Sequence, residues 1–262
     1  EGDFVQTYTE KGFRGNDKEW ESMCIPFGED AKICLNGVID RVDLCSLPGE
    51  ELIKIIDYKS SDSQDLLLAK VYYGLQMQLL TYLEAAKEMV EKEHKGKEAV
   101  PAAMLYYAIK EKNLDWKPES EEEYEKRVLD SMKCKGYVNE EPEIIGHLDK
   151  SVVNGGELIP GQKSGVVPVA VDKKGLLKKN SGALSTKDFE TLIAHTKEKM
   201  KECGKAILDG KIEAIPYVYE DNDGCTYCPY GSVCGYESKK DGVREMKKMS
   251  DDEVWEALYG DD

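Results

Sequence analysis

The chain has 262 residues, 40% of them hydrophobic, and a formal net charge of −16 at pH 7. This length can bury a substantial core, and no apolar run approaches the roughly 20 residues that cross a bilayer, which argues against a helical membrane protein. The acidic balance argues against a free-standing nucleic-acid binder, because phosphate contacts require Lys and Arg, unless neighbouring domains supply the basic surface.

The start of the chain and its cysteines restrict the class of protein further. The first residue is Glu1 rather than Met, and nothing near it resembles a secretory signal, so we interpret the chain as a fragment of a longer protein. Without a signal, the eight cysteines favour metal binding or reduced thiols over disulfide bonds. Cys45, Cys134 and Cys203 are interpreted as isolated thiols.

Apolar periodicity predicts a single α/β domain over residues 1–262, without internal repeats or a clear linker. The predicted strands, in chain order, are 21–27, 33–44, 52–58 and 102–109. The predicted helices are 64–90, 121–132, 187–209 and 251–258. Thr186 is the expected N-cap of the third helix. Residues 155–171, rich in Gly and then Val, predict a loop or hairpin.

The most informative stretch is a pair of predicted strands joined by Pro48-Gly49, a strong turn signal. If the strands form an antiparallel hairpin symmetric about this dipeptide, Asp40 lies directly opposite Asp57. Directly opposed side chains share a face, with Cβ atoms roughly 4.5–5.5 Å apart. Lys59, two residues beyond Asp57, shares that face, and Tyr58 points the other way. The sequence therefore predicts two carboxylates and an amine side by side.

Two carboxylates at that separation repel each other unless one takes up a proton or a divalent cation lies between them. Oxygen ligands favour Mg²⁺ or Mn²⁺ over zinc. Attack of metal-activated water on a phosphodiester is the corresponding chemistry, with Lys59 orienting the water or stabilising charge on the phosphate. The alternative is a hairpin with ordinary surface charges. The isoleucine-rich flank of the second strand opposes it, because charge on a buried strand is costly unless it has a function.

A third motif lies in the helix that follows. Gln78 and Tyr82 are four residues apart and share one helix face, although both could be ordinary helix residues. The pattern Gly37-x-x-Asp40-Arg41-x-Asp43, then Asp57-Tyr58-Lys59-Ser60, then Gln78-Leu-Leu-Thr-Tyr82 resembles the RecB-like branch of the PD-(D/E)xK nucleases. The resemblance implies a restriction-endonuclease-like α/β core, a mixed central sheet flanked by helices. It also implies that Asp40 and Asp57 bind Mg²⁺, that Lys59 assists the chemistry, and that Gln78 and Tyr82 border the active site.

The resemblance is more specific in three segments, residues 71–82, 103–107 and 225–234, which resemble the nuclease domains of AddB-type helicase–nuclease subunits. It runs from about residue 21 to residue 236. It implies a bacterial cytoplasmic protein that processes DNA double-strand breaks for recombination. This subunit would degrade the 5′-ended strand in a heterodimer with an AddA-type subunit. The sequence contains no G-x-x-x-x-G-K-[ST] phosphate loop, so we expect ATP to bind partner domains and not this chain.

Residues 224–236 form a compact loop with the spacing Cys225-x-x-Cys228-x5-Cys234. Three closely spaced thiolates suit a metal or a cluster, spacing alone does not separate zinc from iron–sulfur, and reduced structural cysteines are the alternative. The resemblance implies a [4Fe–4S] cluster that joins the C-terminal segment to the nuclease core. Its fourth cysteine is expected upstream of the catalytic strands, and neither Cys24 nor Cys34 has that context.

A second departure from the family pattern concerns histidine, since an upstream helical His is expected as a further metal ligand. The three histidines, His94, His147 and His195, all follow Lys59 and are interpreted as surface or packing residues. One cause explains both departures: the chain begins after the helices that carry these ligands. We therefore expect weak or absent nuclease activity in the isolated chain, and an unstable or empty cluster.

Two other functions remain open. A non-enzymatic DNA-binding or scaffolding module with a nuclease fold is favoured by the acidic charge, and opposed by the presence of Asp40, Asp57 and Lys59 together. An iron–sulfur exonuclease of CRISPR adaptation would use the same chemistry. Such enzymes are usually shorter, and residues 132–185 are more typical of the helicase–nuclease family.

Overall fold

The structure is a computed structural model that describes residues 2–15, 20–28, 30–60, 65–109, 120–237 and 241–260. The strands are β1 Val5–Phe13, β2 Met23–Phe27, β3 Ala31–Leu35, β4 Gly37–Leu47, β5 Glu50–Lys59, β6 Glu98–Ala108, β7 Lys135–Asn139, β8 Val153–Asn154, β9 Glu157–Leu158, β10 Ala183–Leu184, β11 Tyr217–Tyr219, β12 Asn222–Asp223 and β13 Arg244–Met246. The helices are α1 Leu68–Tyr72, α2 Gln78–Glu93, α3 Glu121–Ser131, α4 Pro142–Leu148, α5 Thr186–Leu208, α6 Gly231–Cys234 and α8 Asp251–Tyr259, with a 3₁₀ turn at Lys150–Val152. Among the described residues, none of the helices has the length and apolar character needed to cross a bilayer.

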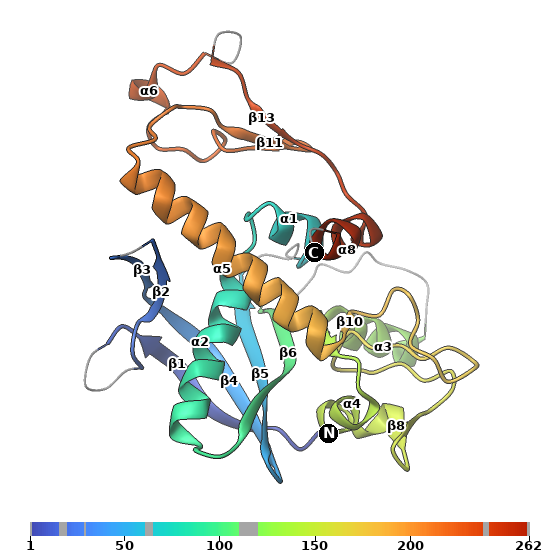
Figure 1. The fold of residues 1–262 in the computed structure, drawn as a ribbon. Coiled ribbons are helices and arrows are strands. Elements are labelled where there is room, and N and C mark those ends of the chain that lie inside the picture. The colour runs from blue at the N-terminus through green and yellow to red at the C-terminus, as the bar shows by residue number, and fades with distance from the viewer. Residues whose placement is uncertain are drawn as a thin grey trace.

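A mixed six-stranded sheet in the order β1-β4-β5-β6-β7-β10 forms the centre of the fold. β5 pairs with β6 in parallel, as β7 does with β10, and the other neighbouring strands are antiparallel. Helix α2 packs on β5 and β6, and α5 packs on α2, so both lie on one side of the sheet (Figure 1). Helix α4 contacts β6 and β7 from the other side. The predicted α/β fold with a flanked mixed sheet is therefore confirmed.

Alternate residues of the central strands enter two separate cores. On β5, Ile53 and Ile55 belong to the core that includes α2 and α5, whereas Leu52 and Ile56 belong to the core that includes α4. Side chains alternate along a strand, so this division places the two cores on opposite faces of the sheet. β5 is buried on both faces, as its isoleucine-rich sequence predicts. By the same alternation, Asp57 lies on the α2 face.

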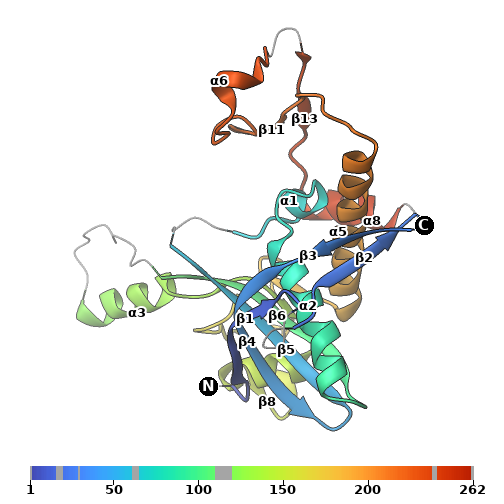
Figure 2. The same cartoon turned by 90° about the vertical axis from the view of Figure 1, so that its left-hand side faces the viewer.

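The C-terminal part of the chain stands apart from the central sheet. Beyond α5, a small sheet in the order β12-β11-β13 and helix α6 extend from the far end of that helix (Figures 1 and 2). Helix α8 then returns to contact α1. Tyr219 on β11 is buried, and its ring lies 6.2 Å from that of Tyr73, with Lys70 Nζ 5.7 Å away. These aromatic contacts attach the C-terminal sheet to the end of α1.

Several predicted elements need correction. The predicted helix 64–90 is two helices, α1 and α2, and Gln64 lies outside the described residues. Gly74 between them has φ = +76°, a left-handed conformation that ends a helix and that glycine adopts without strain. The predicted strand 33–44 is likewise divided, at Asn36, into β3 and β4. The predicted strands 52–58 and 102–109 and the helices 121–132, 187–209 and 251–258 are confirmed, with ends shifted by a few residues.

The N-cap of α5 is Ser185, so the prediction of Thr186 is wrong by one residue. Ser185 Oγ accepts a hydrogen bond from the backbone N–H of Asp188, and the Asp188 carboxylate accepts from the backbone N–H of Ser185. This reciprocal capping box satisfies two backbone donors at once. Strands β1 and β7 and helix α4 were not predicted from the sequence.

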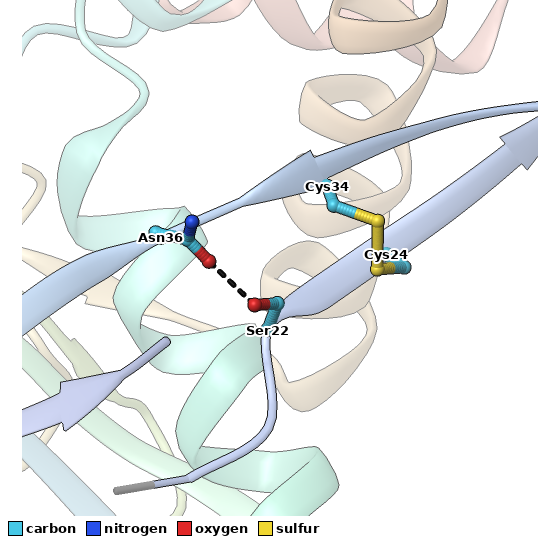
Figure 3. The surroundings of a disulfide bond; sticks show 4 residues. All are labelled: Ser22, Cys24, Cys34 and Asn36. Carbon is cyan, nitrogen blue, oxygen red and sulfur yellow. Dashed lines mark hydrogen bonds between the residues drawn. A yellow bond between two sulfur atoms is a disulfide. The ribbon is translucent and has the colours of Figure 1, made fainter. Parts of the chain in front are cut away.

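The hairpin of β2 and β3 contradicts the expectation of reduced cysteines. Cys24 and Cys34 lie directly opposite each other in this hairpin and form a disulfide bond (Figure 3). At one end of the hairpin, Ser22 Oγ donates a hydrogen bond to Asn36 Oδ1 at 2.5 Å. The expectation failed because the pairing depends on a hairpin that joins cysteines ten positions apart, which composition does not reveal. Cys45, Cys134 and Cys203 are free thiols, as predicted.

Candidate active site

The two predicted ligand aspartates come together through the hairpin of β4 and β5. Its register places Arg41 opposite Ile56, so the next pair toward the open end is Asp40 and Asp57. Gly49 in the connecting turn has φ = +84°, which allows the chain to reverse within two residues. The register predicted from the Pro-Gly turn is therefore confirmed. Both carboxylates lie at the open end of the hairpin, on the face covered by α2.

A backbone hydrogen bond fixes the carboxylate of Asp40. Its Oδ2 accepts from the backbone N–H of Tyr58 at 2.8 Å. Since Tyr58 follows Asp57 in the chain, this bond holds Asp40 beside Asp57. The Tyr58 side chain is exposed, and its hydroxyl lies 3.4 Å from Arg41 Nη1. The two acids and the tyrosine thus occupy opposite faces of the hairpin, as predicted.

Asp57 is the most constrained acid of the site, with only 3% of its surface exposed. Burial raises the pKa of its carboxyl, the negative charge of Asp40 raises it further, and the ammonium of Lys59 opposes both. Lys59 Nζ lies 2.6 Å from Asp57 Oδ2 in an ion pair. Among the described residues, this buried oxygen accepts no hydrogen bond of acceptable geometry. Its ionised form is therefore incompletely compensated by the protein.

Lys59 connects the acids to the helix motif. Its Nζ donates a hydrogen bond to Gln78 Oε1 at 2.8 Å, and Gln78 Nε2 donates to the hydroxyl of Tyr82 at 2.9 Å. Gln78 is the first residue of α2, and the end of β5 meets the start of this helix. The structure therefore brings together all five residues predicted for the site: polar side-chain contacts run from Asp57 to Tyr82, and Asp40 joins them through the backbone of Tyr58.

Gln76, two residues before α2, was not singled out from the sequence. Its Oε1 accepts from the backbone N–H of Leu67 at 2.9 Å, and its Nε2 donates to the carbonyl of Asp65 at 3.0 Å. One amide thus holds the segment that leads into α1 against the start of α2. This arrangement fixes the position of Gln78, because Gln78 follows after a single residue.

The glycine of the first motif allows two aromatic rings to approach β4. A Cβ atom at Gly37 would lie 2.7 Å from Phe13 Cζ and 3.4 Å from Tyr82 Cε1. Phe13 is buried, and its ring meets that of Tyr82 edge to face, with centroids 6.0 Å apart. The absence of a side chain at Gly37 therefore leaves room for the Tyr82 ring, and the hydroxyl of Tyr82 accepts the hydrogen bond from Gln78.

The arginine and second aspartate of the first motif form a separate ionic network. Asp43 is fully buried, and its carboxylate receives Arg41 Nε at 2.6 Å, Arg41 Nη2 at 2.8 Å and Lys54 Nζ at 2.8 Å. Lys54 lies directly opposite Asp43 in the hairpin. These ionic contacts stabilise the pairing of β4 with β5.

Tyr106 packs beside Lys59 on the neighbouring strand. Its register on β6 places it beside Asp57, and only 4% of its surface is exposed. The Lys59 ammonium lies 5.2 Å from the centroid of the Tyr106 ring. Burial, with smaller effects of Asp57 and Tyr82, raises the pKa of Tyr106 to about 12. Sequence reasoning missed this residue because only the parallel pairing of β5 with β6 brings it to the site.

The donor set at the hairpin fits a hard divalent cation. Asp40 and Asp57 provide carboxylate oxygens from neighbouring strands, and the buried Asp57 Oδ2 lacks a directed hydrogen bond. Oxygen donors of this kind match Mg²⁺ or Mn²⁺. Such an ion would also offset the burial and the weaker repulsion from Asp40, both of which raise the pKa of Asp57. Asp40 and Asp57 would be the two side chains that hold such an ion.

The three cysteines of residues 224–236 are exposed, Cys225 and Cys228 in a loop and Cys234 at the end of the short helix α6, which the predicted loop did not include. Asp223 Oδ1 shapes the start of the loop by accepting from the backbone N–H groups of Cys225 and Thr226 at 2.9 and 2.7 Å. Partial desolvation raises the pKa of Cys225, and the charges of Asp223, Cys228 and Cys234 add to this. In the described part of the chain, no three His, Cys, Asp or Glu side chains converge closely enough to hold a metal ion. The segment thus presents three exposed free thiols that do not converge on one point in this structure.

The three histidines lie away from the aspartate pair, each with another partner. His94 Nδ1 lies 3.0 Å from Glu51, and His147 Nδ1 lies 2.9 Å from Asp3. His195 stacks on Tyr72 and hydrogen-bonds the Tyr72 carbonyl at 2.8 Å. These contacts account for all three histidines as packing or surface residues.

Comparison with known proteins agrees with this geometry. The family model of the PD-(D/E)XK nuclease superfamily matches residues 3–235. The B subunit of the ATP-dependent helicase/deoxyribonuclease of Lachnoclostridium phytofermentans is 36% identical over 89% of this chain and 20% of its own length. The proteins of the same name from Thermoanaerobacter sp. (strain X514) and Alkaliphilus metalliredigens are 33% and 34% identical, over 97% and 98% of this chain and 21% and 22% of their own lengths. The chain thus spans about a fifth of these relatives. Since the family model covers most of the chain, the chain belongs to the PD-(D/E)XK nuclease superfamily.

Proposed function

We propose that this chain is the metal-dependent DNA exonuclease domain of an AddB-type subunit of a bacterial recombination helicase–nuclease. In this role it hydrolyses phosphodiester bonds of the 5′-ended strand at a double-strand break, in the cytoplasm and together with an AddA-type partner subunit. The names of the relatives support the helicase–nuclease context. ATP is used by other domains of that complex.

The observation that carries this proposal is the meeting of Asp40, Asp57 and Lys59 on one face of the hairpin. Asp40 and Asp57 would hold Mg²⁺ or Mn²⁺, which when bound supplies Lewis-acid activation of water and neutralises charge on the phosphate. Lys59 is held between Asp57 Oδ2 and Gln78 Oε1, so its ammonium is oriented before substrate arrives. It would donate to a phosphate oxygen, where negative charge increases in the transition state.

The net charge of −16 requires that DNA be held mainly by other parts of the complex. A local cation and Lys59 can contact one phosphate, but they do not provide an extended basic track. The whole-protein context resolves the objection that the acidic composition raises, because the chain covers only about a fifth of its relatives.

The direct test replaces Asp57 with Ala in the full-length subunit assembled with its helicase partner. We expect degradation of the 5′-ended strand to fall by at least two orders of magnitude, while ATP-dependent unwinding stays intact. Strand-specific end labels measure the first activity and a fluorescent unwinding assay the second.

Glu50→Ala is the matched control, because Glu50 is an exposed acid on the same strand, at its opposite end. It should leave both activities unchanged. Undiminished cleavage by the Asp57 variant would overturn the enzymatic proposal and favour a DNA-binding or scaffolding module with a nuclease fold.

We further propose that Cys225, Cys228 and Cys234 supply three ligands of a [4Fe–4S] cluster, with a fourth cysteine from an upstream part of the full-length subunit. The close spacing Cys225-x-x-Cys228-x5-Cys234 and the exposure of all three free thiols support this. Iron and labile sulfide in the purified full-length protein should equal four atoms each per chain. Stoichiometric zinc without iron would instead assign a zinc site.

A further inference from the structure

Lys59 is a flexible side chain whose catalytic use, under the proposed function, requires a fixed position. Two of its contacts come from polar atoms, Asp57 Oδ2 at 2.6 Å and Gln78 Oε1 at 2.8 Å. Both partners are themselves available to other groups, since Asp57 is a candidate metal ligand and Gln78 also bonds Tyr82. If Asp57 held a cation, its carboxylate would be shared with that cation, and Lys59 would need a further support for which the cation does not compete.

The ring of Tyr106 is in position to be that support. Its centroid lies 5.2 Å from Lys59 Nζ, within the range in which an ammonium is attracted to an aromatic face. The attraction is largest where water is excluded, and Tyr106 is 4% exposed. An aromatic face is electrically neutral, so a divalent cation does not bind it in preference to carboxylates.

The position of the ring is fixed by the sheet rather than by the helix. Tyr106 lies on β6 directly beside Asp57 of the parallel strand β5, with Met104, also in the α2 core, two residues before it. The ring therefore cannot leave without a change in the central strands. Tyr106 contacts Lys59 from β6, whereas Gln78 contacts it from α2, so the two contacts are independent.

We propose that Tyr106 is a positioning residue of the nuclease site, whose ring face holds the Lys59 ammonium in register with Asp57. This inference rests on the proposed function. The hydroxyl is not required for it, because a neutral aromatic face supplies the attraction. A ring that only filled the core would predict equal effects of all large apolar replacements.

The first test compares Tyr106→Phe with Tyr106→Leu in the full-length subunit with its partner. We expect kcat for 5′-strand cleavage by Tyr106→Phe to stay within about twofold of the wild type. We expect Tyr106→Leu to lower kcat about tenfold, with KM for DNA unchanged, in line with the strength of a partly desolvated cation–π contact. Equal kcat for the two variants would overturn the inference.

Stability is controlled with Leu105→Val, a buried change on the opposite face of the same strand. This variant should lower Tm without a loss of kcat. If Leu105→Val reduced kcat as much as Tyr106→Leu at matched Tm, the effect of position 106 would be structural and the inference would fail.

A second test changes only the ring electrostatics. Phenylalanine with one, two and three ring fluorines, inserted at position 106, keeps the size of the ring while progressively weakening the negative face. The logarithm of kcat should fall steadily with each fluorine, and a flat series would contradict the proposal.

The Asp57→Ala variant separates this inference from the proposed function. Loss of cleavage in Asp57→Ala, combined with identical Phe and Leu variants at position 106, would reject the role of Tyr106 alone. Retained cleavage in Asp57→Ala would reject the nuclease assignment itself.

Discussion

At the scale of single residues, Gly37 shows how a position without chemistry of its own determines the geometry of the site. The Phe13 and Tyr82 rings occupy the space that a side chain at position 37 would fill. Phe13 Cζ lies only 2.7 Å from where a Cβ atom would be. Tyr82 in turn receives the hydrogen bond from Gln78, which receives that of Lys59. A displacement at residue 37 is therefore transmitted to the lysine through three side chains.

Gly37→Ala should consequently reduce both stability and cleavage. The added methyl group overpacks the contact, which costs about 1–3 kcal/mol of unfolding free energy. Urea unfolding of the purified chain measures the loss of stability. The rate of 5′-strand cleavage by the full complex measures the loss of activity.

The mechanism of that effect can be checked by compensation. Phe13→Leu removes the ring that the new methyl group meets, so the double variant should recover part of the lost stability, with a favourable coupling between the two changes. Strictly additive effects would show that the Gly37 contact is not the cause.

At the scale of elements, Glu51 joins three of them at the closed end of the hairpin. It is the second residue of β5, its carboxylate accepts from Ser46 of β4, and it pairs with His94 and Lys97, which follow α2. Burial alone would raise the pKa of Glu51, but the hydrogen bonds from Ser46, Lys97 and His94 together lower it.

This shift makes a prediction for acid stability. Because the folded pKa lies below the unfolded value of about 4.3, Glu51 stabilises the fold fully above that value. The contribution is lost as pH falls through the folded pKa. Glu51→Gln should thus be less stable than the wild type at pH 7, and the difference in unfolding free energy should shrink as pH falls from 5 to 3.

Denaturant midpoints at a series of pH values measure this difference. Glu50→Gln, at the exposed neighbouring position, is the control. Its denaturant midpoint should change with pH in the same way as that of the wild type. A Glu51→Gln difference that stays constant down to pH 3 would assign the effect to packing instead of charge.

The elements also show what the sequence can predict. The β4–β5 register followed from the Pro48-Gly49 turn, because a tight turn leaves one pairing of the two strands. The positions of Asp40, Asp57 and Lys59 on a common face followed from that register. The contact of Lys59 with Gln78 was implied only by resemblance, since nothing in strand geometry relates β5 to α2.

Other features could not be predicted, for identifiable reasons. β1 is an edge strand whose residues are mostly exposed, so it lacks the alternation that marks a buried strand. The apolar helical period continues through Gly74, which concealed the break between α1 and α2. Tyr106 and the Cys24–Cys34 disulfide depend on strand pairings that residue types do not specify.

At the scale of the whole molecule, the β2–β3 hairpin connects the central sheet to the long helix α5. Its inner side packs on α5, where Phe27 closes against Gly204, and its second strand continues into β4 after Asn36. The Cys24–Cys34 disulfide lies on the exposed side. A two-stranded hairpin is only marginally stable by itself, so this cross-link and the contact with α5 both contribute.

Removing the cross-link should therefore lower the stability of the folded chain. Cys24→Ser with Cys34→Ser should cost up to about 3 kcal/mol, the chain-entropy value for a loop of this size. Thermal unfolding under non-reducing conditions measures the effect, and a dithiol reductant should bring the wild type to the Tm of the double variant.

Cys203→Ser provides the control, since this free thiol is exposed on α5. It should unfold like the wild type with or without reductant. A double variant of unchanged Tm would show that packing on α5 alone stabilises the hairpin.

The compact placement of the site within the chain has a consequence for biosynthesis. Asp40, Asp57, Lys59, Gln78 and Tyr82 all belong to one hairpin and the helical segment that follows it. Contacts between near neighbours in sequence close small loops, whose entropic cost is low, so they form early. We expect a nascent chain to pair these strands before the cysteine loop has left the ribosome. Maturation of any cluster there would then occur on a chain in which these five side chains are already close together.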